Sequence, residues 1–233
     1  MIYSWTSQYI LYFLGIMIVM YAQAKINSAY QKYRQIDNLK HITGKEVARK
    51  ILDYHQLYDV RIEVSNGGRL SDHYDPVNKI VRLSSDVYYN KSIASLSIAA
   101  HEVGHAIQHK EKYGVIALRN RLLPAASIAS QLGWIVIVIG LFLFAEIPWL
   151  IYIGIGMLVT ILLFQIVTLP IEINASNRAM QQLDTLGLIL PQEKQAVNSM
   201  LKAAAYTYIA AVLATLTQIL RILIMILGRS KRD

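Results

Sequence analysis

The sequence predicts an α+β integral membrane protein that is mostly helical, with three or four transmembrane helices and a small α+β domain. Hydrophobic residues make up 55% of the 233 residues, and the mean hydropathy is +0.36. Charged residues make up only 16%, against about 25% in an average soluble domain. Long uncharged stretches alternate with one stretch of ordinary polarity. This composition excludes a disordered or collagen-like chain and argues against an ordinary soluble protein.

Residues 1–24 carry no charge and are long enough to cross a bilayer as a helix. A cleaved signal peptide is the alternative, but no basic segment precedes the apolar run, and residues 21–24 only faintly resemble a cleavage site. We therefore expect residues 1–24 to be a retained transmembrane helix.

Two further apolar stretches follow later in the chain. Residues 122–171 carry one formal charge, Glu146, which precedes a proline and a tryptophan, so we expect a transmembrane hairpin with Glu146 among the lipid headgroups. Residues 203–228 are apolar apart from Arg221. This segment either spans the membrane or lies in the interface with Arg221 snorkelling, and both interpretations stay open.

Residues 25–121 have the polarity of a small folded domain. Its first part, residues 25–39, is expected to extend the first helix. Thr43 and Glu46 form a capping box, in which each side chain accepts a hydrogen bond from the other residue's backbone N–H, so a helix is expected up to about Gln56.

The rest of this domain is expected to hold a small sheet and one buried helix. Residues 60–64 alternate between apolar and polar, residues 80–83 resume an extended pattern, and Asn66-Gly67-Gly68 between them favours a turn. Residues 92–110 are apolar around most of a helical circumference, which is typical of a buried helix.

The buried helix carries the motif His101-Glu102-Val103-Gly104-His105, which fits H-E-x-x-H. The i, i+4 spacing places both imidazoles on one face, where they can hold one zinc ion, and Glu102 lies beside the metal. Zinc lowers the pKa of a bound water towards about 7, and Glu102 can take the proton. Three ionisable groups in a buried helix need such a partner.

A catalytic zinc usually has a third protein ligand, for which His109 and Glu172 are the candidates. Each i+4 step rotates by about 40°, so three histidines on consecutive turns do not all close on one ion. Glu172 is the better candidate because it follows an apolar segment and opens a polar helical segment, residues 172–202. Ser176, one turn later, could help to orient a ligand.

The pattern resembles the membrane-embedded gluzincin metalloproteases, including those of the HtpX type, in which a Glu on a later helix joins H-E-x-x-H. It is more closely similar to the neutral zinc metallopeptidases of the YugP type, a bacterial family. The segments that carry this second resemblance are Asp72-His73-Tyr74-Asp75-Pro76, His101-Glu102-Val103-Gly104-His105-Ala106-Ile107-Gln108 and Leu169-Pro170-Ile171-Glu172-Ile173-Asn174-Ala175-Ser176.

The resemblance implies a zinc metalloendopeptidase of the bacterial plasma membrane that acts on peptides or membrane proteins, with a role in membrane-protein quality control. It implies His101, His105 and Glu172 as ligands of one Zn²⁺ per chain, and Glu102 as the general base. Ser176 stands where the broader gluzincin pattern has an acidic residue, so any orienting group at this position is neutral here.

Residues 71–76 allow two interpretations. An extended substrate could pair with the strand at residues 80–83, expected to be the edge strand, while His73 or Tyr74 stabilises the oxyanion. We favour the alternative, a turn begun by the Asp-Pro pair and capped by Asp72.

The distribution of positive charge predicts a cytoplasmic catalytic domain with an outside N-terminus. Basic residues flank the central domain at both ends, whereas the hairpin turn has only an acidic one. Arg178 is expected to snorkel at the membrane surface. The C-terminal charges oppose this topology if the last segment spans. The flanking residues are Lys25, Lys32, Arg34, Lys40, Lys110, Lys112, Arg119 and Arg121, and the C-terminal ones are Arg229, Lys231 and Arg232.

The sequence allows two other functions, which its residues support less well. A non-proteolytic membrane scaffold with a structural or vestigial zinc site would have no use for Glu102 and would usually close four protein ligands; the absence of cysteine also excludes thiolate ligands. Nucleic-acid binding is suggested only by the net charge of +8, which the membrane topology explains. We therefore expect no nucleic-acid partner.

Overall fold

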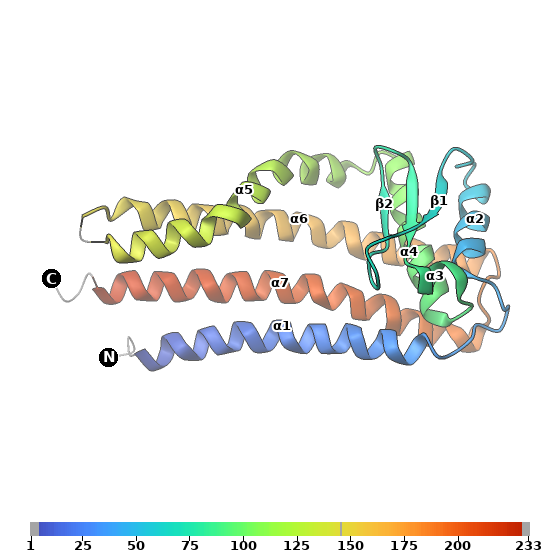
Figure 1. The fold of residues 1–233 in the computed structure, drawn as a ribbon, viewed down its shortest axis with the longest axis horizontal. Helices are drawn as coiled ribbons and strands as arrows, with labels where there is room; N and C mark the ends of the chain where they lie inside the picture. Colours follow the sequence, from blue (N-terminus) through green and yellow to red (C-terminus); the bar gives the residue numbers. More distant parts are fainter. Residues whose placement is uncertain (1–4, 145, 230–233) are drawn as a thin grey trace. The chain divides into compact units, whose positions relative to one another are not determined.

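A computed structural model describes residues 5–144 and 146–229, with the side chains of 5–7, 228 and 229 left out (Figure 1). The chain divides into two compact units. The first, which we call the membrane unit, comprises residues 1–23, 115–169 and 207–233; the second, the site unit, comprises residues 24–114 and 170–206.

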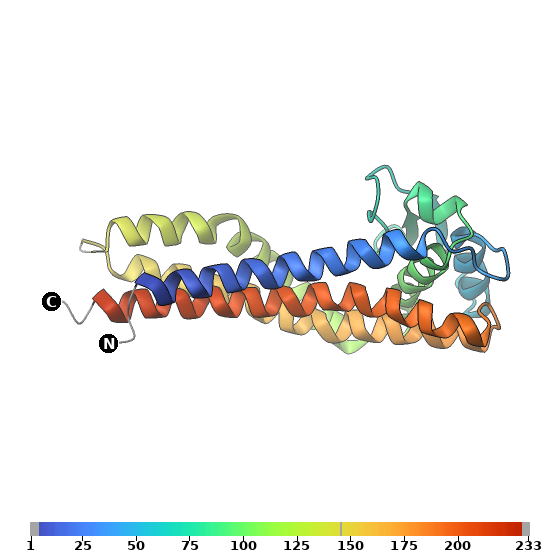
Figure 2. The same ribbon diagram turned by 90° about the horizontal axis from the view of Figure 1, so that it is seen from below.

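The membrane unit is built from parts of four long helices that run side by side (Figures 1 and 2). Within the described residues, four helices are long and apolar enough to cross a membrane. Many of their large apolar side chains are exposed, which suits a surface that faces lipid rather than water. The four are α1 (Trp5–Tyr33), α5 (Gly114–Phe142), α6 (Trp149–Thr185) and α7 (Lys194–Arg229).

These helices approach one another closely at small residues, as is usual in membrane helix packing. A Cβ atom on Gly140 would lie 2.8 Å from the backbone nitrogen of Ile151, so α5 and α6 meet there at backbone distance. In α7, Arg221 lies over the ring of Tyr12, 4.9 Å from its centroid. Residues 203–228 thus belong to one long helix, while Lys231 and Arg232 lie outside the described residues.

In the site unit, the first helix ends at Tyr33 rather than extending to residue 39. The helix α2 (Gly44–Tyr54) begins with the expected capping box. The backbone N–H of Glu46 donates to the Thr43 hydroxyl at 3.2 Å, and the Thr43 N–H donates to the Glu46 carboxylate at 2.7 Å. These bonds satisfy donors that the first turn of a helix leaves free.

The sheet has three strands in the order β1-β3-β2, and β3 (Ile80–Leu83) is central. It pairs in parallel with β1 (Arg61–Val64) and antiparallel with β2 (His73–Asp75). The expectation that residues 80–83 form the edge strand is therefore wrong. The edge next to α4 is β2, part of the segment that we interpreted as a turn.

The turn itself lies immediately after β2. One carboxylate oxygen of Asp75 accepts hydrogen bonds from the N–H groups of Val77 and Asn78, both at 3.0 Å. Asp75 therefore caps the turn, in place of Asp72, which we had expected to do so. The Asp72 carboxylate instead accepts from the N–H of Ser84 at 2.7 Å and from its hydroxyl at 3.2 Å.

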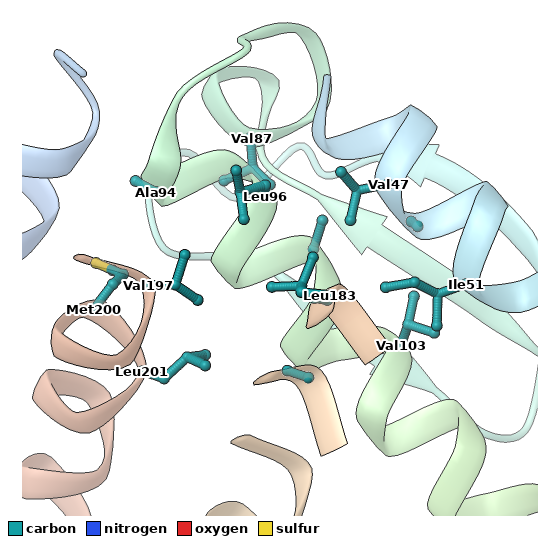
Figure 3. Close-up of a cluster of buried hydrophobic side chains, with 14 of the residues drawn as sticks. Val47, Ile51, Val87, Ala94, Leu96, Val103, Leu183, Val197, Met200 and Leu201 are labelled. Carbon is teal, nitrogen blue, oxygen red and sulfur yellow. The ribbon is translucent and has the colours of Figure 1, made fainter. Parts of the chain in front are cut away.

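The helix α4 (Ile93–Lys110) is the centre of the site unit. It begins at Ser92, whose hydroxyl accepts from the N–H of Ser95. Its apolar side chains pack with those of α2, α6, α7 and the short α3 (Ser85–Tyr89), as Figure 3 shows for Val103, Leu183 and Val197. The turn η1 (Pro191–Glu193) joins α6 to α7. A rigid, buried helix thus carries the H-E-x-x-H motif.

Candidate metal centre

Three side chains from two helices converge at one point of the site unit. His101 and His105 project from the same face of α4, one turn apart, and Glu172 comes from α6. The Oε2 atom of Glu172 lies 3.3 Å from Nε2 of His101 and 3.6 Å from Nε2 of His105. Within the described residues, one ligand atom from each of the three lies within 4.8 Å of the others.

This arrangement fits a zinc ion. Nitrogen and oxygen ligands bind zinc at about 2.0–2.2 Å, which places the ligands of a tetrahedral ion about 3.3–3.6 Å from one another. The two distances to Glu172 fall in this range. All three donors are partly buried, with 13–20% of their side-chain surface exposed.

His109, the other candidate for the third ligand, does not belong to this group. Its Nδ1 atom lies 2.9 Å from the hydroxyl of Tyr74 on β2, and the residue is exposed near the end of α4. This places His109 as a polar residue at the helix end, which agrees with the geometric reason for preferring Glu172.

The charged groups around the site change the pKa values of His105 and Asp72. Burial lowers the pKa of His105, but the interactions with Glu172 and Glu102 outweigh it and raise this pKa to about 9. A metal ion that binds His105 at neutral pH would therefore displace a proton, so metal affinity is expected to increase with pH. Glu102 is only 8% exposed. Burial, together with the charge of Glu102, raises the pKa of Asp72 to about 6, although the hydrogen bonds from Ser84 lower it.

The Nδ1 atom of each motif histidine, which is not the atom nearest Glu172, lies within hydrogen-bond distance of a polar side chain. The Ser176 hydroxyl lies 3.1 Å from Nδ1 of His101, so the ligand that Ser176 can orient is His101. For His105 the partner is Gln108, whose Oε1 lies 3.0 Å from Nδ1. The role of Gln108 was missed, although a polar residue three positions after His105 in an apolar helix was a usable signal.

Gly104 lets the two ligand helices approach at backbone distance. A Cβ atom on this residue would lie 2.7 Å from the carbonyl oxygen of Ala175 on α6, a distance that real Cβ atoms essentially never show. Ala175 is less than one turn from Glu172. The glycine inside the motif thus sets the distance between the third ligand and the two histidines.

We expect Gly104→Ala to weaken zinc binding and to destabilise the protein by about 1–3 kcal/mol, the usual cost of overpacking a core. The added methyl group must push α6, and Glu172 with it, away from α4. Thermal unfolding and zinc competition measure the two effects. Gly114→Ala is the matched control, because a Cβ atom there meets nothing within 4 Å. Equal zinc affinity in both variants would contradict this account.

The other residues that the sequence singled out, His73, Arg178 and Glu146, do not belong to the group of three donors. The Nδ1 atom of His73 is 2.8 Å from the carbonyl oxygen of Ser71. Arg178 does not snorkel: it pairs with Glu111 at 2.6 Å, and only 21% of its side chain is exposed. Glu146 is exposed between α5 and α6.

Comparison with known proteins agrees with the site. The model of the family described as "Putative neutral zinc metallopeptidase" matches residues 8–227. The chain is also 42% identical over 214 residues to the "Putative membrane protease YugP" of Bacillus subtilis (strain 168). The matched region covers 91% of this chain and 93% of that protein. No solved structure matches. With nearly its whole length matched and four helices suited to a membrane, this chain belongs to the neutral zinc metallopeptidase family and is an integral membrane protein.

Proposed function

We propose that the chain is a membrane-bound zinc endopeptidase whose metal is held by His101, His105 and Glu172, with Glu102 as the general base. The observation that carries the proposal is the convergence of these three donors beside a buried glutamate. A donor set of two histidines and one glutamate is typical of catalytic zinc sites, which leave a further position open. A structural site would usually close with four protein ligands.

Zinc, when bound, polarises a substrate carbonyl and makes a coordinated water more acidic. The protein's side chains supply proton transfer and the orientation of the ligands. Glu102 takes a proton from the attacking water and passes it to the leaving amine. Burial of Glu102 strengthens its interaction with positive charge at the site. Ser176 and Gln108 fix the two imidazoles, so the donors need little rearrangement to bind the metal.

We further propose membrane proteins, including misfolded ones, as substrates and the cytoplasm as the location of the site unit. Glu172 directly follows the apolar stretch of α6 in the chain, so the sequence couples a membrane span to a metal ligand. The basic residues at both ends of residues 25–121 support a cytoplasmic location of the site unit.

Zinc content and cleavage of casein by the detergent-purified protein test the proposal. We expect one zinc per chain, loss of cleavage with a chelator, and recovery when zinc is restored. Casein serves as an unfolded substrate that demands no particular sequence. Stoichiometric zinc without cleavage of casein or of unfolded membrane proteins would favour the scaffold, and absence of zinc would refute the metal site.

A further inference from the structure

We propose that Gln108 is a positioning residue that holds His105 in the tautomer needed for metal binding and ties it to the helix that carries Glu172. This inference rests on the proposed metal site. Gln108 is completely buried, lies three residues after His105, and makes three hydrogen bonds with residues on both ligand helices. Burying an amide costs free energy unless its polar atoms are hydrogen-bonded, and both polar atoms of Gln108 have partners here.

The orientation of the Gln108 amide follows from its partners. Its Nε2 lies 2.9 Å from the backbone carbonyl oxygen of Ile171, which can only accept. The same nitrogen lies 2.9 Å from Oδ1 of Asn174. That Asn174 atom also accepts a hydrogen bond from Nε of Arg178 at 2.7 Å, and a guanidinium can only donate. Two independent acceptors therefore require the nitrogen of Gln108 on this side.

The amide oxygen of Gln108 must then face His105. Oε1 lies 3.0 Å from Nδ1 of His105 and can only accept, so Nδ1 must carry the proton. In the neutral ring that binds a metal, the lone pair is then on Nε2, the atom that faces Glu172. The partner of His101 imposes no such choice, because the Ser176 hydroxyl can donate or accept.

Arg178 sets which atoms donate and which accept in this series of hydrogen bonds, because its guanidinium can only donate. Arg178 is anchored by Glu111 at the end of α4, with Nη2 and Oε2 separated by 2.6 Å. From Arg178 the bonds run through Asn174 and Gln108 to His105 and cross from α6 to α4 once; the ion pair with Glu111 is a second link between the two helices. Gln108 is the link that acts on both the tautomer of one ligand and the position of the helix bearing another.

The test measures zinc affinity of the full chain in detergent by competition with a chromogenic chelator. We expect Gln108→Met, which keeps the length of the side chain but none of its bonds, to weaken zinc binding about 10–100-fold. Gln108→Glu keeps an acceptor for Nδ1 but loses the amide donor to the Ile171 carbonyl and to Asn174, so it should recover only part of the affinity. Ser97→Ala is the control, because Ser97 is a buried polar residue of the same helix that bonds only to the Ile93 carbonyl.

A spectroscopic measurement on the wild type does not depend on how the variants fold. In ¹⁵N spectra of histidine-labelled, zinc-loaded protein, we expect His105 to be protonated at Nδ1, with slow exchange of that proton. Correlation with the backbone amide of the same residue assigns the signal to His105. Protonation at Nε2 or unchanged zinc affinity in Gln108→Met would each overturn the role of Gln108. A wild type without zinc would instead overturn the metal site itself.

Discussion

Glu102→Gln is expected to retain zinc and to lose cleavage of casein by about 10²–10⁴-fold, the range that general acid–base catalysis contributes. The glutamine has nearly the same shape, so the packing of α4 is preserved, but an amide cannot take a proton from water. Zinc content and the rate of casein cleavage, measured on the same preparation, separate the two effects.

Glu63→Gln is the matched control for this prediction. Glu63 lies on β1 and pairs with Arg61 and Arg82 at the protein surface, away from the metal ligands. The same chemical change there should leave zinc content and cleavage close to those of the wild type. If Glu102→Gln cleaved casein as fast as Glu63→Gln, Glu102 would not be the general base.

Glu172→Ala is expected to lose zinc almost completely. Substituting a residue that only hydrogen-bonds to a ligand usually lowers metal affinity about 10–100-fold, and we expect the loss here to be larger. The variant leaves two histidines, which do not hold zinc at the affinity of three protein ligands. Metal content after dialysis and competition with a chelator measure the loss, and cleavage should disappear with the metal.

His109→Ala distinguishes Glu172 from the alternative third ligand. Because His109 contacts Tyr74 and lies outside the group of three donors, its removal should leave zinc content unchanged. A variant Glu172→Ala with full zinc beside a His109→Ala variant without it would reverse the ligand assignment.

The parts of the fold that the sequence predicted well are those governed by local rules. The capping box at Thr43 and Glu46 and the buried helix after Ser92 depend on residues three or four apart, and both are found where expected. Fold class followed in the same way from the length of the apolar stretches. The structure likewise brings together the two motif histidines and the preferred third candidate, Glu172.

The features that sequence analysis missed depend on contacts between distant segments. Which strand lies at the sheet edge is decided by the pairing of β3 with both of its neighbours, and nothing in residues 80–83 alone reveals it. Ser176 was expected to orient a ligand, but its spacing does not show which one, and its contact with His101 on another helix depends on how the two helices pack. The spacing of Gln108 from His105 was a signal for the bond within α4, but the bonds of Gln108 to Ile171 and Asn174 cross to α6 and do not follow from that spacing.

The separation of the metal donors along the chain has a consequence for biosynthesis. His101 and His105 lie on α4, whereas Glu172 follows only after the whole of α5 and the apolar part of α6. A nascent chain that has been translated only as far as α5 therefore holds an incomplete donor set. With the proposed ligand set, the metal site is complete only after the hairpin segments have been synthesised, so a nascent chain has no complete site with which to cleave itself or its neighbours.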